Sequence, residues 1–130
     1  MASPQWELQG LIWSTLDAAL TVPIHDSVPE SAVKPYVSFG PEDWTPADAE
    51  CIQGEEVTIQ LDIWSDDRIE GRKTCKEVMF DIKKALHNVP LLLAEHAYVD
   101  GQLILSRIGD DPEEKIVHGV MQFTFMIDVT

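Results

Sequence analysis

A chain of 130 residues can bury one hydrophobic core but is short for two, which predicts a single domain over residues 1–130. A hydrophobic fraction of 45% excludes a disordered chain, and a formal net charge of −14 argues against a protein that grips nucleic-acid phosphates. No run approaches the roughly 20 apolar residues of a membrane span, and the N-terminus lacks the basic start of a signal peptide. With its two cysteines interpreted as reduced thiols, the chain is expected in the cytoplasm.

The first element expected is an amphipathic helix that begins at Ser3 and Pro4 and ends near Thr21. Ser3 suits an N-cap, Pro4 suits the first helical turn, and apolar residues then recur at spacings of three and four. Prolines punctuate residues 22–35, which predicts irregular or extended backbone there.

A short strand is expected at residues 36–39, ended by Gly40 and Pro41. Residues 41–54 then read as an acidic, turn-rich loop. A loop of this length in a compact domain is often functional, which makes its exposed Trp44 a candidate for contact with a partner.

The clearest pattern covers residues 55–86, where a half-buried strand leads through an acidic turn into a helix. Apolar residues alternate with polar ones from Val57 to Ile63, which is typical of a strand with one buried face. Asp66 and Asp67 are suited to capping the helix that follows. From Ile69 onward the apolar residues return with helical spacing.

The C-terminal part predicts two further strands. Residues 91–93 are expected at the edge of the core, and a strand is expected over residues 97–108 with a bulge or turn at Asp100 and Gly101. An acidic hairpin at residues 109–114 leads to the last strand, which alternates up to Val129 and is expected to be central and antiparallel to the strand before it. The predicted fold is therefore α+β: a mostly antiparallel four-stranded sheet with two amphipathic helices packed on one face.

A search for chemistry finds little. The four histidines lie in four different segments without metal-ligand spacing, and no catalytic or nucleotide-binding motif is present. The acidic hairpin could attract a cation, but it is better explained as a solvated surface. The sequence thus predicts neither an enzyme nor a cofactor nor a bound metal.

Charge is segregated along the chain. Six of the nine basic residues but only three of the 23 acidic ones lie between residues 68 and 84. These charges can form a solvated helix face, or the basic stripe of one copy can meet the acidic loops of the next in a head-to-tail contact. The candidate interface residues on this second interpretation are Arg68, Arg72, Lys73, Lys76, Glu42, Asp43, Trp44, Asp110, Asp111, Glu113 and Glu114.

Short motifs that run in order along nearly the whole chain resemble those of a known family. They are Leu16-Asp17-Ala18-Ala19-Leu20, Val28-Pro29, Lys34-Pro35-Tyr36-Val37-Ser38-Phe39-Gly40, Glu56-Val57-Thr58-Ile59-Gln60-Leu61-Asp62-Ile63-Trp64-Ser65, Lys84-Ala85-Leu86 and His118-Gly119. With them the chain is similar to the tail-completion, or tail-terminator, proteins of long-tailed phages and gene transfer agents.

The resemblance implies a structural virion protein that forms a ring, typically of six copies, at the head-proximal end of a tail tube. Such a ring ends tube polymerisation, binds the tail tube protein and the neck protein, and lets DNA pass without sequence-specific binding. It implies no catalysis and no cofactor, and it places the protein at the tail–neck junction of a virion assembled in the bacterial cytoplasm. The alternatives are a head-closure or neck joining protein of the same particle and an acidic module that mimics DNA.

Overall fold

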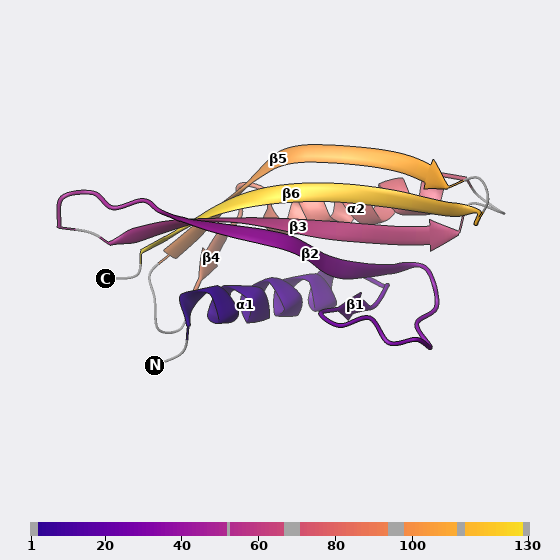
Figure 1. Ribbon diagram of the computed structural model, residues 1–130, viewed down its shortest axis with the longest axis horizontal. Coiled ribbons are helices and arrows are strands. Elements are labelled where there is room, and N and C mark those ends of the chain that lie inside the picture. The colour runs from indigo at the N-terminus through magenta and orange to yellow at the C-terminus, as the bar shows by residue number, and fades with distance from the viewer. Residues whose placement is uncertain (1–2, 52, 67–70, 94–97, 112–113, 129–130) are drawn as a thin grey trace.

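The computed structural model describes the chain except residues 1–2, 52, 67–70, 94–97, 112–113 and 129–130. A curved sheet carries two helices on one face (Figure 1), so the α+β class expected from the sequence is confirmed. In chain order the elements are α1 Pro4–Ala19, β1 Ile24–His25, β2 Tyr36–Pro46, β3 Gly54–Asp66, α2 Lys73–Leu86, β4 Pro90–Leu92, β5 Tyr98–Asp111 and β6 Ile116–Asp128.

Over the described residues the sheet has six strands in the order β1-β2-β3-β6-β5-β4, so the expected number of four was wrong. The two additional strands are short outer ones: β1 pairs parallel with β2 over two residues, and β4 pairs antiparallel with β5 over three. Strands of two or three residues are too short to show alternation, and their pairing depends on partners that are distant in sequence.

The two central strands, β3 and β6, are paired without a break from Gly54 opposite Asp128 to Asp66 opposite Ile116. Their buried residues alternate, as the sequence predicted, and β6 lies between β3 and β5. The expectation of a central last strand, antiparallel to the one before it, is confirmed.

The strand that begins at Tyr36 does not stop at Gly40 and Pro41. It continues to Pro46, so the expected loop over residues 41–54 is mostly strand β2 and its turn. The register with β3 shifts between Phe39 and Glu42, which means that Gly40 and Pro41 lie in a bulge. A side chain at Gly40 would lie 2.5 Å from Asp62 Oδ2, so the bulge brings the backbone too close for one.

Two other boundaries differ from the expected ones. Helix α2 begins at Lys73 with Arg72 at its N-cap and no side-chain cap; Asp66 is the last residue of β3, and Asp67 lies outside the described residues. Strand β5 extends to Asp111, and its bulge falls between Leu103 and Leu105 rather than at Asp100 and Gly101.

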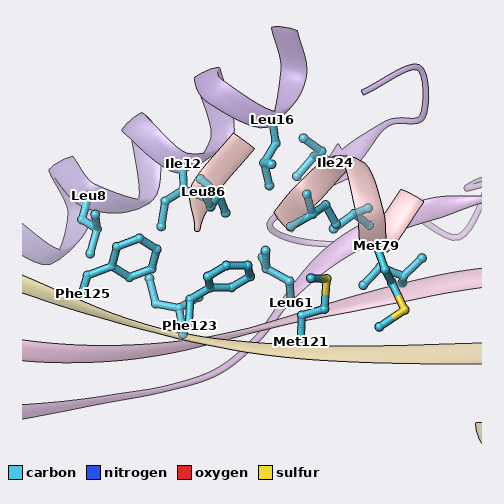
Figure 2. Packing of buried hydrophobic residues seen from close by; sticks show 14 of the residues in the cluster. Leu8, Ile12, Leu16, Ile24, Leu61, Met79, Leu86, Met121, Phe123 and Phe125 are labelled. Atoms are coloured by element: carbon cyan, nitrogen blue, oxygen red, sulfur yellow. The ribbon is translucent and has the colours of Figure 1, made fainter. Parts of the chain in front are cut away.

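The hydrophobic core lies between the sheet and the two helices (Figure 2). Helix α1 contributes Leu8, Ile12 and Leu16, all fully buried, and Ser3 caps it by accepting a hydrogen bond from the Trp6 amide at 3.3 Å. These residues and the buried side of α2 pack on the apolar face of β3 and β6, whose largest members are Phe123 and Phe125. In the part of the chain that the structure describes, no helix lies on the opposite face of the sheet, which is called the open face below.

Candidate functional site

The basic residues of α2 lie opposite its buried side. Cys75, Val78, Met79, Ile82 and Leu86 are buried, whereas Arg72 at the N-cap and the four lysines of the helix are exposed. The segregated charges of the sequence therefore form one exposed stripe, formed by Arg72, Lys73, Lys76, Lys83 and Lys84. Arg68, the remaining predicted member, lies outside the described residues.

Arg72 is paired within its own chain. Its Nε donates to Asp110 Oδ1 at 3.3 Å, and its Nη2 donates to the other oxygen of the same carboxylate, which joins the start of α2 to the end of β5. This hydrogen bond holds the pKa of Asp110 below its ordinary value and raises the pKa of Arg72. The structure thus brings together two predicted interface residues of opposite charge, but inside one subunit.

A shallow groove runs between α2 and β5, with a volume of about 430 Å³. The aromatic ring of Phe80 is 61% exposed beside it, an unusual position for a large apolar side chain. Basic side chains surround this apolar surface. We call it the α2–β5 groove, and its main lining residues are Lys76, Met79, Phe80, Lys83, Arg107 and Ile108.

Acidic and aromatic side chains gather at the far end of β2. The indole of Trp44 is 55% exposed and donates a hydrogen bond to Glu42 through Nε1. Trp6 of α1, 65% exposed, lines the same hollow of about 180 Å³ as Glu42 and Trp44. We call this surface the Trp44 patch; its members are Trp6, Glu42 and Trp44, and Asp43 lies between the last two on the opposite face of β2.

The groove and the patch lie at opposite edges of the sheet and at different positions along its strands. Trp44 is opposite Val57 near the start of β3, whereas Arg107 of the groove is opposite Val120, which is itself opposite Asp62 in the second half of β3. Five residues of strand separate Val57 from Asp62, which corresponds to roughly 17 Å at 3.3 Å per residue. The two surfaces of one chain therefore do not meet each other.

Strands β2 and β5 each keep part of one edge open, because their outer neighbours β1 and β4 are short. Strand β1 pairs with β2 only at Val37 and Ser38, and β4 pairs with β5 only from Tyr98 to Asp100. Past these contacts, the β5 backbone makes two hydrogen bonds with the residues that follow α2: the Gly101 carbonyl accepts from the Asn88 amide, and the Leu103 amide donates to His87 Nδ1. In the part of the chain that the structure describes, no strand pairs with the outer edge of β2 from Glu42 onward or with that of β5 from Ile104 to Asp110.

The other predicted acids are scattered about the β5–β6 hairpin. Asp111 is the last residue of β5 and lies opposite Ile116, and Glu114 is exposed in the turn. Glu113 lies outside the described residues.

A polar cluster on the open face was not singled out from the sequence. His118 Nε2 lies 2.8 Å from Asp62 Oδ1, and its ring stacks on Trp64 with the centroids 3.9 Å apart. Trp64 in turn donates to Ser38 Oγ at 3.0 Å. These contacts link β2, β3 and β6. The sequence could have indicated the cluster, because Trp64 and His118 both belong to motifs that carry the family resemblance.

Neither cysteine is in a disulfide: Cys51 is exposed and Cys75 is buried. Burial raises the pKa of the Cys75 thiol, which favours its neutral form. Across the described ranges, no group of three or more His, Cys, Asp or Glu side chains could hold a metal ion. The same ranges contain no helix long and apolar enough to cross a membrane.

Both the sequence and the fold of this chain are similar to those of known proteins. A sequence model of the tail completion protein gp17 family matches residues 14–128. Tail completion protein gp17 of Bacillus phage SPP1 is 24% identical over 94 residues, which are 72% of this chain and 68% of that protein. Among solved structures, a chain of the virion of a native gene transfer agent particle superposes with a TM-score of 0.81 at 20% identity, covering 98% of this chain and 99% of that one.

The match over most of the chain and the shared fold define a structural protein of the bacteriophage tail. More narrowly, the chain belongs to the tail completion protein gp17 family. The resemblance drawn from the sequence motifs is thereby confirmed.

Proposed function

We propose that copies of this protein form a ring, of six members, at the head-proximal end of a tail tube. The ring ends polymerisation of the tube and offers a surface on which the neck of the head is joined. The observation that carries this proposal is membership of the tail completion family over residues 14–128, nearly the whole chain.

The shape of the subunit supports assembly from one kind of chain. Open strand edges lie on both sides of the sheet, and surfaces of opposite character lie beside these two edges. A subunit with two different, complementary surfaces makes head-to-tail contacts, which form a ring when the rotation between copies closes.

The charge of the protein suits a passage for DNA. A net charge of −14 repels phosphates, so DNA passes through such a ring without sequence-specific binding. The partners on this proposal are other copies of the chain, the tail tube protein and the neck protein. The ring belongs to the tail–neck junction of a virion that assembles in the cytoplasm of the host bacterium, and no catalytic step is part of its role.

Electron microscopy of particles produced with and without the gene tests the function directly. Loss of a tube terminator gives over-long or ragged tubes without heads, and a copy of the gene supplied in trans restores normal length. Tubes of normal length that fail to join heads would instead assign the protein to head closure or neck joining. Intact infectious particles would refute both roles and favour an acidic binding module.

A further inference from the structure

We propose that the α2–β5 groove of one copy receives the Trp44 patch of a second copy, with the open edge of β2 laid along the open edge of β5. This contact rests on the ring proposed above and identifies the two surfaces that join its members.

Hydrogen bonding favours the contact. An open strand edge presents a row of unpaired backbone N–H and C=O groups, which pair readily with another strand. Each copy carries two such edges, at Glu42–Pro46 and at Ile104–Asp110, on opposite sides of its sheet. Pairing the β2 edge of one copy with the β5 edge of the next continues the sheet from copy to copy. Each copy then contacts one neighbour through its β2 edge and another through its β5 edge.

The faces of the sheet also agree. Residues opposite each other in an antiparallel pair point to the same face. Trp44 is opposite the buried Val57 and therefore points to the helix-bearing face, where α2 of the receiving copy forms the wall of its groove. In a continuous sheet, the indole of one copy is thus directed toward the exposed ring of Phe80 in the next.

The charges are complementary. Among the described residues, no ion pair involves Lys76, Lys83 or Arg107, while Arg72 is already paired with Asp110. Glu42 lies opposite Ile59 and points to the helix-bearing face. In the proposed contact, this face is the one on which the receiving copy presents the lysines of its groove.

Asp43 faces the other way. It lies opposite Thr58 and points to the open face. Arg107 lies opposite Val120, between the inward-facing Gly119 and Met121, so its strand position belongs to the open face, although at this sheet edge it also borders the α2–β5 groove. Asp43 of one copy and Arg107 of the next are therefore expected to pair.

A charge exchange tests this pair. Arg107→Glu should raise the dissociation constant between copies by about tenfold or more, because it places like charges across the contact. Asp43→Arg combined with Arg107→Glu in the same chain should restore assembly, since each copy supplies both surfaces. Lys115→Glu makes the same change in net charge outside both surfaces and should assemble as the parent protein does. Native mass spectrometry of the purified proteins, alone and with isolated tail tubes, gives the number of copies.

A disulfide test locates the contact independently of charge. In a Cys51→Ser background, one protein carries Asp43→Cys and another carries Arg107→Cys. Oxidation of the mixture should give a covalent dimer with one chain of each, because a disulfide forms only between residues whose Cα atoms lie within about 7 Å. A mixture of Asp43→Cys and Lys115→Cys proteins is the control and should stay uncoupled.

The outcomes separate this contact from the ring itself. If the parent protein forms a ring that Arg107→Glu leaves intact and no mixed dimer appears, the contact is wrong and the ring stands. If Arg107→Glu keeps the ring but loses binding to tail tubes, the groove holds the tube protein and the contact is again wrong. If the parent protein stays monomeric both alone and on tubes, the ring and the contact are both refuted.

Discussion

The substitution Phe123→Ala tests the core on which both helices rest. Phe123 is 0% exposed, its ring centroid lies 6.1 Å from that of Phe125, and it packs in the cluster between the sheet and the helices (Figure 2). We expect the substitution to lower the free energy of unfolding by about 3–5 kcal/mol, because it removes buried apolar surface and leaves a cavity.

The magnitude follows from the burial. A buried aromatic side chain removes about 150–250 Å² from water, and at about 25 cal/mol per Å² this corresponds to roughly 4–6 kcal/mol. Alanine keeps a small part of that burial, while loss of the contact with Phe125 adds about 0.5–1.5 kcal/mol to the cost. Small domains unfold with about 5–15 kcal/mol in total, so the variant should be only marginally folded.

Urea unfolding followed by tryptophan fluorescence measures the change. With a slope of about 2 kcal/mol per molar, a loss of 4 kcal/mol lowers the midpoint by about 2 M. Both proteins are compared at one concentration, because assembly would stabilise the folded state by mass action. Met126→Ala is the matched control: it lies on the same strand, is 44% exposed, and should change stability by about 0.5 kcal/mol or less.

A loss below about 1 kcal/mol with an unchanged slope would refute the reasoning. It would mean that the Phe123 side of β6 is not the core face of the folded protein, and that the placement of both helices on that face is also wrong.

Three further changes test local features. Gly119→Ala should destabilise by about 1–3 kcal/mol, because a Cβ there would lie 2.7 Å from Cys75 Sγ and 2.8 Å from Met79 Sδ, and thermal unfolding measures the loss. Cys51 should react with a thiol reagent in the native protein while Cys75 reacts only after unfolding, since burial raises the pKa of the Cys75 thiol and excludes the reagent; titration of thiols with and without urea gives the counts. The pKa of Asp110 is lowered in the folded state, so the stability contributed by its pair with Arg72 is present above the ordinary carboxyl pKa of about 3.9 and is lost as the pH falls through the lowered value. Asp110→Asn should therefore make stability depend less on pH at the acid end, as urea midpoints between about pH 2 and 5 would show.

Each of these has a control. Gly109→Ala should be tolerated, because no atom lies within 4 Å of the Cβ it would add; an equal loss there would show that the close approach at Gly119 is not the cause. Rapid reaction of both thiols in the native protein would contradict the burial of Cys75. An unchanged acid-end slope in Asp110→Asn, compared with Asp17→Asn at an exposed position of α1, would contradict the role of the Arg72 pair.

The sequence predicted the elements whose pattern is local and long. Val57 to Ile63 and Met121 to Ile127 alternate because one face of each strand is buried, and the apolar residues of α2 recur with the helical period for the same reason. The family could also be inferred, because its motifs lie in order along one chain. That the chain forms one domain over residues 1–130, and that the predicted interface residues join subunits, stay predictions.

Only the tertiary structure decided which features meet. Strands β1 and β4 form because two residues of β1 pair with β2 and three residues of β4 pair with β5. Gly40 and Pro41 form a bulge because β2 pairs with β3 on both sides of them. The same long-range pairing places His118 against Asp62 and Trp64, and it pairs Arg72 with Asp110 inside the subunit. It also leaves the edges of β2 and β5 open on opposite sides of the sheet. The local sequence determines which face of each helix or strand is buried. The order of the strands and the edges that stay unpaired depend instead on contacts between residues far apart in the chain.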